Sequence, residues 1–376
     1  MKKRYLMTPG PTMVPPEVLL NMAQSMIHHR APDFTPIFRR VSENLKYVFQ
    51  TENPVVIFAS SGTGAMEASI INTLSAGDKA IAVEGGKFGQ RWCDLCSAYK
   101  VNVVKLSIDW SKSITPEEIE KALKENPDTK AVFITLCETS SGALTDIKAI
   151  GEVVKKTDAI LVVDAISGLG AEEFYTDKWN VDITVTGSQK ALMLPPGLAF
   201  ASINKKAEAL MEKSTLPKYY FSIKKSLKNL KDDTTPYTPA VSLLIGLDKS
   251  LEMIKEEGIE NIWARHKKLA NAIRAGIKTI GLELYPKNPS NVVTTVKVPE
   301  GIDGGKIIKI LRDKYGITIA GGQDHLKGKI FRIATLGYAD TFDVTTIISA
   351  LELTLAELGH KLDVGEGTKA AIKALL

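Results

Sequence analysis

Three short stretches of the sequence carry residues suited to binding an anion, holding a proton and attacking a carbonyl. The stretch Ser60-Ser61-Gly62-Thr63-Gly64 would let a helix begin with its amide groups facing an anion. Asp164 ends the apolar run Leu161-Val-Val-Asp164, and Lys190 follows Thr186-Gly187-Ser188-Gln189. A lysine becomes nucleophilic, and able to form a Schiff base, when burial lowers its pKa.

Each stretch alone also fits an ordinary role, as a strand-to-helix turn, a loop anchor or a surface lysine. The first lacks the Gly-Lys-Ser/Thr of a phosphate loop and the third glycine of a dinucleotide fingerprint. All three, however, follow predicted strands, and ligands of open α/β sheets bind at the carboxyl ends of the strands. A nucleophilic lysine, an acid that protonates a ring nitrogen and an anion-binding turn together indicate pyridoxal phosphate (PLP) chemistry.

Seven apolar, β-branched runs alternate with helical stretches and predict a mainly parallel seven-stranded sheet. These runs cover residues 55–59, 79–84, 101–106, 130–135, 159–164, 182–186 and, after Pro195-Pro196-Gly197, 198–203. Thr115-Pro-Glu-Glu and Asp146-Ile-Lys are typical helix starts, because each places a capping side chain before the first turn.

The last hundred residues change in style and predict a smaller α+β domain, joined by the N-terminal arm. Helices are expected over 241–257, 261–280, 305–315 and 344–358, with strands over 292–298 and 329–334. We therefore expect an N-terminal arm over residues 1–20, a large domain over 21–255 and a small domain over 256–376.

The composition is that of a globular protein that is long enough for two domains. Apolar residues make up 44% of the 376 positions and charged residues 24%, with a net charge of +5 spread along the chain. The basic stretch 218–231 is short and is expected to be a solvated face, so no nucleic-acid partner is predicted. The first nine residues are too poor in apolar side chains for a signal peptide, and no apolar run reaches the ~20 residues of a membrane helix. We expect a cytoplasmic protein without membrane contact.

The cysteines invite a metal or redox interpretation, which the spacing does not support. Cys93-x-x-Cys96 has no second pair, and Cys137 stands alone. The residues around the pair predict a helix, which would place both thiols on one buried face. The five histidines show no ligand spacing, so no metal site is predicted.

Five motifs in the same order give the chain a resemblance to the class V aminotransferases of PLP fold type I, particularly the alanine–glyoxylate, serine–glyoxylate and serine–pyruvate group. The motifs are Thr8-Pro9-Gly10-Pro11, Ser61-Gly62-Thr63-Gly64, Val163-Asp164, Ser188-Gln189-Lys190-Ala191 with Pro195-Pro196-Gly197, and Phe331-Arg332-Ile333. The likeness covers nearly the whole chain. It implies an α/β fold with a large PLP-binding domain and a smaller α+β C-terminal domain.

The resemblance assigns roles to individual residues. Lys190 matches the lysine that holds PLP as a Schiff base and then moves the substrate proton, and Asp164 matches the partner of the ring nitrogen. The phosphate positions correspond to Ser61, Gly62, Thr63 and Gln189. Thr139 matches the residue that hydrogen-bonds the ring hydroxyl oxygen, and Phe88 matches the aromatic ring stacked on the cofactor, where close relatives often have Trp. Arg332 matches the clamp of the substrate α-carboxylate, and Thr8 also falls at a substrate position.

The resemblance further implies a homodimer whose active sites are shared between subunits. The segment Thr235-Pro236-Tyr237-Thr238-Pro239 matches the part that reaches the partner's phosphate site. Thr235 departs from relatives that carry Tyr there, whereas Thr238 follows the pattern of the resemblance.

The predicted reaction is transamination from serine or alanine to glyoxylate or pyruvate. An aspartate-using enzyme is the alternative, and Arg30 is then a candidate second cation. A desulfurase-like enzyme of the same fold would need a cysteine in the loop 318–329, which contains none. A nicotinamide-dependent oxidoreductase could use the glycine-rich turn but would leave Lys190 and Arg332 without a purpose. A non-catalytic subunit would have little reason to keep a lysine, an acid and a phosphate turn together.

Overall fold

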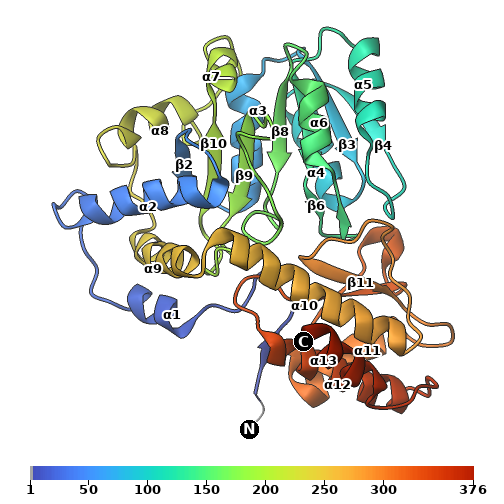
Figure 1. The fold of residues 1–376 in the computed structure, drawn as a ribbon. Coiled ribbons are helices and arrows are strands. Elements are labelled where there is room, and N and C mark those ends of the chain that lie inside the picture. The colour runs from blue at the N-terminus through green and yellow to red at the C-terminus, as the bar shows by residue number, and fades with distance from the viewer. Residues whose placement is uncertain (1–2) are drawn as a thin grey trace.

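The protein is built on a seven-stranded sheet that lies between two layers of helices (Figure 1). The structure is a computed structural model and describes residues 3–376; residues 1 and 2 of the predicted arm lie outside it. The spatial order of the strands is β2 (Val55–Phe58), β10 (Ala199–Ile203), β9 (Ile183–Gly187), β8 (Ile160–Asp164), β5 (Ala131–Thr135), β3 (Lys79–Glu84) and β4 (Asn102–Ser107). Only β10 runs antiparallel to its neighbours in this sheet, which confirms the predicted, mainly parallel arrangement.

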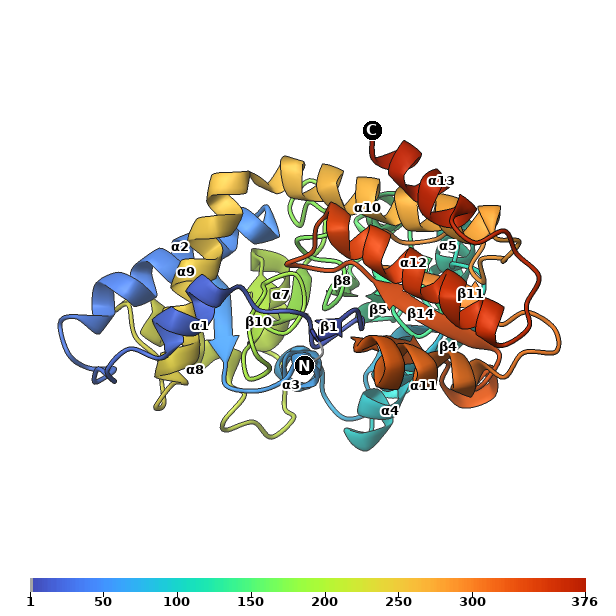
Figure 2. The same ribbon diagram turned by 90° about the horizontal axis from the view of Figure 1, so that it is seen from below.

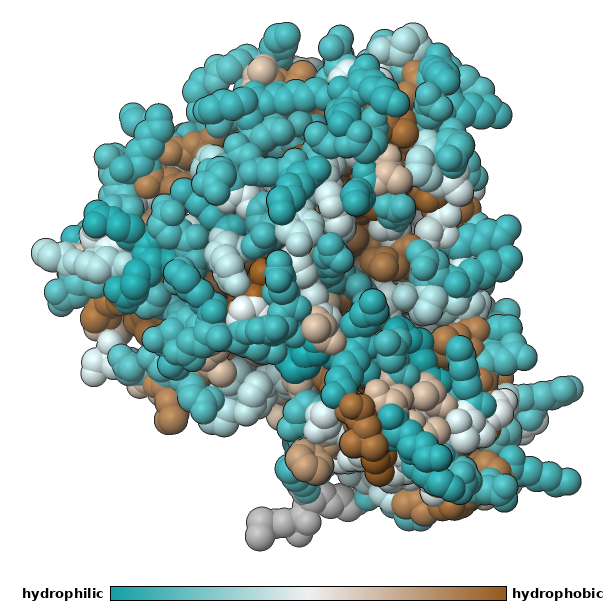
Figure 3. Space-filling view, in the orientation of Figure 1, coloured by the Kyte–Doolittle hydropathy of each residue, from teal (hydrophilic) through white to brown (hydrophobic). Residues whose placement is uncertain are grey.

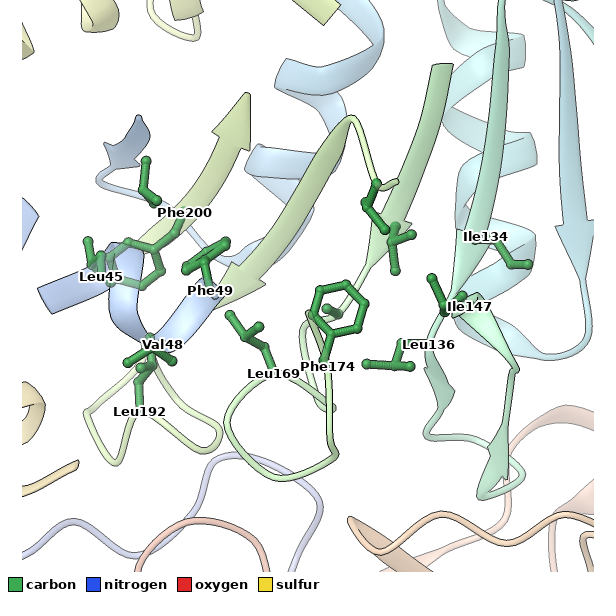
Figure 4. Close-up of a cluster of buried hydrophobic side chains, with 14 of the residues drawn as sticks. Leu45, Val48, Phe49, Ile134, Leu136, Ile147, Leu169, Phe174, Leu192 and Phe200 are labelled. Atoms are coloured by element: carbon green, nitrogen blue, oxygen red, sulfur yellow. The ribbon is translucent and has the colours of Figure 1, made fainter. Parts of the chain in front are cut away.

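Both faces of the sheet are buried, because successive side chains of a strand point to opposite sides. In β8, Leu161 and Val163 belong to one apolar cluster, whereas Ile160 and Val162 belong to the other. The first cluster packs under α2 (Phe34–Phe49), α5 (Pro116–Glu125), α6 (Ile147–Val154) and α9 (Val241–Glu257), and part of it is drawn in Figure 4. The second packs under α3 (Gly62–Thr73), α4 (Lys87–Ala98), α7 (Lys205–Met211) and α8 (Ile223–Leu230). This burial explains why the strands appear as continuous apolar runs.

Two helix starts that the sequence predicts are confirmed by their capping contacts. The Thr115 hydroxyl accepts a hydrogen bond from the Glu118 amide at the start of α5, and the Glu118 carboxylate accepts one from the Thr115 amide. Asp146 caps α6 through the amide of Ala149 at 3.0 Å. In contrast, the first amides of α3 and α4 donate no hydrogen bond to a side chain of their own cap residue.

The C-terminal part surrounds a three-stranded antiparallel sheet, seen below the large sheet in Figure 1. This sheet has the order β11 (Val293–Lys297), β14 (Ile330–Ala334) and β13 (Ala320–Gly321), and it packs with α10 (Ile259–Thr279), α11 (Gly304–Tyr315) and α12 (Thr341–Glu357). The helix α13 (Glu366–Leu375) packs on α10 and α12 and was not predicted from the sequence. Helix α12 begins three residues earlier than expected.

The N-terminal arm joins this C-terminal part, as expected. Strand β1 (Tyr5–Leu6) pairs in parallel with β12 (Ile317–Thr318), and the Ala334 amide donates to the carbonyl of Met7. Figure 2 shows β1 between the large and the small sheet. The arm then continues into α1 (Pro16–Met22), which packs on α9. The chain therefore passes close to the carboxyl edge of the large sheet before that sheet begins.

The remaining sequence expectations concern the cysteines and the surface. Cys93 and Cys96 are buried on the inner side of α4, and burial raises the pKa of their thiols to about 11 and about 12. No group of three or more His, Cys, Asp or Glu side chains among residues 3–376 is arranged to hold a metal ion. Across the same residues, every helix is too short or too polar to cross a bilayer. The face in Figure 3 is mostly hydrophilic, with apolar residues in separate patches.

Candidate active site

Lys190 is a buried amine in the connection that follows β9. Its side chain is held between the sheet and the N-terminal arm, where its Nζ donates a hydrogen bond to the carbonyl oxygen of Pro9 at 2.5 Å. The residue is only 9% exposed. Burial lowers the pKa of the amine to about 8, although the nearby charge of Asp164 acts in the opposite direction. About a tenth of the amine is therefore neutral, and nucleophilic, at pH 7, far more than of an ordinary lysine.

Asp164 is a buried carboxyl group at the carboxyl end of β8. One of its oxygens accepts a hydrogen bond from the amide of Ile166 at 2.8 Å. Burial raises the pKa of Asp164 to about 7, while the positive charges of Arg91 and Lys190 oppose that rise. A buried carboxylate at this position can keep a basic ring nitrogen protonated, because the ion pair between the carboxylate and the protonated nitrogen is strong where water is excluded.

The glycine-rich turn at the start of α3 lies against the strand ends that carry Asp164 and Lys190. Gly62 packs so closely on Ile166 that a Cβ atom there would lie 2.5 Å from its Cδ1. A Cβ on Gly187 would lie 3.1 Å from Gln189 Oε1 and 3.4 Å from the amide nitrogen of Gly62. The tertiary structure thus brings the three sequence stretches together at one edge of the sheet.

This edge fits the phosphate end of PLP. The Ser61 side chain makes no capping bond to α3, which leaves the first amides of the helix without that partner. The buried Oε1 of Gln189 also has no hydrogen-bond partner among the described residues. The hydroxyl of Thr63 already accepts a hydrogen bond from Arg91 Nη1 at 3.1 Å, which places a further cation beside the turn. Amide donors and a cation suit a phosphate group, and Gln189 could add a donor only through its side-chain NH2 group, since its unpaired Oε1 is an acceptor.

Arg332 lies in the middle of β14 with its guanidinium directed toward the large sheet. Its Nε and Nη2 donate to the carbonyl of Gly321 at 2.9 and 2.7 Å, and its Nη1 donates to the carbonyl of Thr139 at 2.7 Å. Burial lowers its pKa to about 10, so the group stays charged at neutral pH. Two carbonyls from opposite sides of the site thus fix a planar cation that suits a carboxylate.

Three other predicted residues lie around the same site. The hydroxyls of Thr139 and Ser167 are 2.7 Å apart, in the buried stretch that also anchors Arg332. Phe88 is half-buried in the first turn of α4, and the Arg91 guanidinium lies 5.0 Å from its ring centre. Thr8 lies on the arm next to Pro9, and its hydroxyl donates to the carbonyl of Pro11 at 2.7 Å.

Glu138 is a site residue to which the sequence analysis gave no role. Its buried carboxylate accepts hydrogen bonds from the amides of Phe88 and Gly89, at distances from 2.9 to 3.3 Å, and from Ser140. It therefore caps α4, whose own cap residue Gly86 has no side chain to do so. Its position directly before Thr139 was the available signal. Arg91 was missed in the same way, although it lies one helical turn after Phe88.

Thr235 and Thr238 lie in the connection between α8 and α9. The Thr235 hydroxyl donates to the carbonyl of Tyr237 at 2.7 Å, and its own carbonyl accepts from Arg30. Thr238 is exposed beside a groove of about 790 Å³ that Met26 also lines. None of the hydrogen bonds found in residues 3–376 joins either threonine to Lys190 or Asp164.

Comparison with known proteins gives the class to which this fold and site belong. Residues 4–335 match the family described as Aminotransferase class-V. The soluble hydrogenase small subunit of Synechococcus sp. (strain PCC 6716) is 42% identical over 379 residues, spanning 99% of this chain and 98% of the relative. The L-aspartate–glyoxylate aminotransferase of Paracoccus denitrificans is 36% identical and is matched over 96% of this chain and 94% of its own. The serine–glyoxylate aminotransferase of Methylorubrum extorquens is 35% identical, over 98% and 95%.

Solved structures agree with the sequence relatives. The crystal structure of the ureidoglycine–glyoxylate aminotransferase of Bacillus subtilis superposes with a TM-score of 0.93 at 30% identity, covering 100% of this chain and 98% of that one. The chain therefore belongs to the class V aminotransferase family, whose members are PLP enzymes, and it is a transaminase.

Proposed function

We propose that Lys190 binds PLP covalently and that the enzyme transfers an amino group from serine or alanine to glyoxylate or pyruvate. The observation that carries the proposal is the buried amine of Lys190, which lies within electrostatic reach of Asp164 and Arg332. The names of the aspartate–glyoxylate, serine–glyoxylate and ureidoglycine–glyoxylate relatives share one acceptor, which favours glyoxylate here.

The residues around the site would divide the work of binding and proton movement. PLP, when bound, supplies an aldehyde for amine exchange and a ring that withdraws electrons from the substrate α-carbon. Asp164 would hold the ring nitrogen protonated. The turn at Ser61 to Thr63, with Gln189, would hold the phosphate. Thr139 would contact the ring hydroxyl oxygen, and Phe88 would stack on the face of the ring. Lys190 Nζ can take and return a proton near neutral pH, because burial has brought its pKa to about 8.

Arg332 would bind the α-carboxylate of the amino acid through its planar pair of donors. Its side chain is fixed by the carbonyls of Thr139 and Gly321 before substrate arrives, so little freedom is lost on binding. Thr8 lies next to Pro9, whose carbonyl accepts a hydrogen bond from Lys190. Arg30, the candidate for a second carboxylate, bonds instead to the Thr234 hydroxyl and the Thr235 carbonyl, in the segment expected to face a partner subunit.

We also propose a homodimer in which Thr238, and more weakly Thr235, reach the partner's phosphate site. The N-terminal region carries exposed apolar side chains, including Leu20 at 70% and Met26 at 69% exposure, which a subunit interface would cover. The groove beside Thr238 is lined by Met26 and by the start of α9, so Thr238 lies on the same surface as the exposed side chain of Met26. The domain boundaries at residues 20 and 255 and the cytoplasmic location also remain our proposals.

The test is a half-reaction screen of the purified, PLP-loaded enzyme. Single amino acids are mixed with the enzyme, and the visible absorption of the bound cofactor is followed. Serine or alanine should bleach the band, and glyoxylate should restore it. If no amino acid bleaches the band while a nicotinamide cofactor binds tightly, the oxidoreductase alternative replaces the proposal.

The attachment point is tested by borohydride reduction followed by peptide mapping. Lys190→Ala should abolish the reducible linkage. Lys218→Ala is the matched control, because burial also lowers the pKa of Lys218, but its amine bonds to Ile71 and Ser214 instead. A linkage that survives in Lys190→Ala would place the cofactor on another residue.

A further inference from the structure

Lys87 is a cation whose backbone is anchored next to the residue that holds Arg332. It is the first residue of α4, and Phe88 follows it. The backbone amide of Lys87 donates a hydrogen bond to Ser140 Oγ at 3.0 Å. The carbonyl of Thr139, the residue before Ser140, accepts a hydrogen bond from the Arg332 guanidinium. Lys87 and Arg332 are therefore anchored by adjacent residues of one buried stretch.

The amine of Lys87 is held by an acid from the other part of the molecule. Its Nζ lies 3.1 Å from Asp324 Oδ2, in the short helix η1 (Asp324–Leu326). That loop begins at Gly321, whose carbonyl is the second anchor of Arg332. A second contact holds the same loop, because the rings of His325 and Trp110 are 4.5 Å apart. The loop that follows Gly321 thus starts at the anchor of Arg332 and contacts Lys87 and Trp110 of the large domain.

The ion pair is accessible and open to competition. The side chains of Lys87 and Asp324 are 39% and 47% exposed, so water and small solutes reach both. Pairs of this kind are weak, and a carboxylate on a bound ligand offers the same chemical group as Asp324. A donor that binds Arg332 by its α-carboxylate and carries a second carboxylate would compete with Asp324 for Lys87.

We propose that the Lys87–Asp324 pair sets the preference of this enzyme for amino donors with uncharged side chains. Asp324 occupies the cation that a dicarboxylic donor such as aspartate needs, and its own charge repels the second carboxylate. Small donors such as serine bind at Arg332 without disturbing the pair. The inference rests on the proposed function, since it concerns the donor of that same reaction.

The test compares single-turnover bleaching by aspartate and by serine in four proteins. Asp324→Asn should raise the aspartate-to-serine ratio of reactivity about fivefold, because Lys87 then loses its carboxylate partner and keeps only a hydrogen bond to the neutral Oε1 of Gln90, at 3.1 Å. Lys87→Met should lower the ratio below that of the unmodified enzyme. In the double variant, Asp324→Asn should give no gain, because its effect acts through Lys87. Asp128→Asn, which breaks the 2.7 Å surface pair with Lys79, is the matched control and should leave the ratio unchanged.

Equilibrium binding gives a second readout that does not depend on turnover. Calorimetry with succinate and with propionate measures the gain from a second carboxylate directly. Asp324→Asn should tighten succinate binding about fivefold and change propionate binding little, whereas Lys87→Met should remove the difference between the two acids.

Three results would overturn the inference. Equal changes in the bleaching rates of aspartate and serine would mean that the loop only joins the two parts of the protein and does not select the donor. A gain for aspartate that persists in the double variant would show a general charge effect that does not use Lys87. Succinate binding that no variant alters would place the second carboxylate elsewhere. Loss of transamination with every donor in the unmodified enzyme would instead contradict the proposed function, and the succinate titration would still decide the role of the pair.

Discussion

The Lys190 amine and the Pro9 carbonyl oxygen are 2.5 Å apart, although 181 positions separate the two residues in the sequence. The N-terminal arm therefore closes directly on the lysine that we propose binds the cofactor. The next residue, Gly10, leaves room for this approach, because a Cβ atom there would lie 2.5 Å from Lys190 Nζ. The arm thus contacts the candidate site through Pro9 and Gly10 and also contributes β1, which pairs with β12.

We expect Gly10→Ala to displace the Lys190 side chain and to lower PLP binding and kcat/KM at least tenfold. Gly77→Ala is the matched control, since both glycines have positive φ values, 131° and 87°, but the space around Gly77 is open. Absorbance of the bound cofactor and steady-state kinetics measure the effect. Equal losses in both variants would mean that backbone strain, and not contact with Lys190, is responsible.

The pH dependence of PLP uptake should report the buried amine. The neutral form of Lys190 attacks the aldehyde, and burial lowers the pKa of this amine to about 8 from the usual 10.5. The uptake rate of the apoenzyme should therefore rise through pH 7, reach half its maximum near pH 8 and level off by about pH 9. Stopped-flow absorbance follows the reaction. A rate that keeps rising beyond pH 10 would indicate an exposed lysine instead.

Asp164→Asn should stabilise the apoenzyme at pH 8 while it abolishes most activity. Burial raises the pKa of Asp164 to about 7 in the folded protein, above the 3.8 of an ordinary aspartate. Between these pH values the folded protein binds the extra proton, so this group makes the protein less stable as the pH rises from about 4 to about 7. The variant should gain about 1–3 kcal/mol in unfolding free energy at pH 8 and almost nothing at pH 4. Denaturant titrations at both pH values decide the outcome.

Glu138→Gln should loosen the start of α4 and weaken PLP binding. The glutamine amide group would face backbone N–H donors that now bond to a carboxylate, at a cost of about 2 kcal/mol in folding free energy. Glu118→Gln, in the exposed capping box of α5, is the matched control. Thermal unfolding measures stability, and circular dichroism of the cofactor band measures ring placement. A cofactor signal that Glu138→Gln leaves unaltered would show that Phe88 is positioned by other contacts.

Leu20→Glu should separate the proposed dimer into monomers and lower activity at least tenfold, because a charge would lie in the apolar interface. Leu353→Glu on α12 replaces another exposed leucine, 45% exposed, outside the proposed interface and should leave the mass unchanged. Light scattering after size-exclusion chromatography gives the mass. An unmodified protein that is monomeric and fully active would contradict the shared site.

The sequence by itself determined the strands of the large sheet, several of the helices and the main chemical groups of the candidate site. Apolar runs with both faces buried, and capping residues such as Thr115 and Asp146, are local signals, so the strands and several helix starts followed from them. Lys190 and Asp164 were predicted to share a site because strand ends in such sheets meet at one edge. Helix α13 was missed because its start depends on a distant acid, Glu352, which accepts hydrogen bonds from Gly367 and Thr368.

Only the tertiary structure decided which distant groups meet. The Glu138 cap on α4, the Pro9 carbonyl at Lys190 and the Asp324 carboxylate at Lys87 each join segments that lie far apart in the chain. Local propensity and periodicity specify elements within about a dozen residues, whereas these contacts depend on how whole layers pack. The same packing sets the pKa values of Lys190 and Asp164, because burial is a property of the assembled fold and not of the residue type.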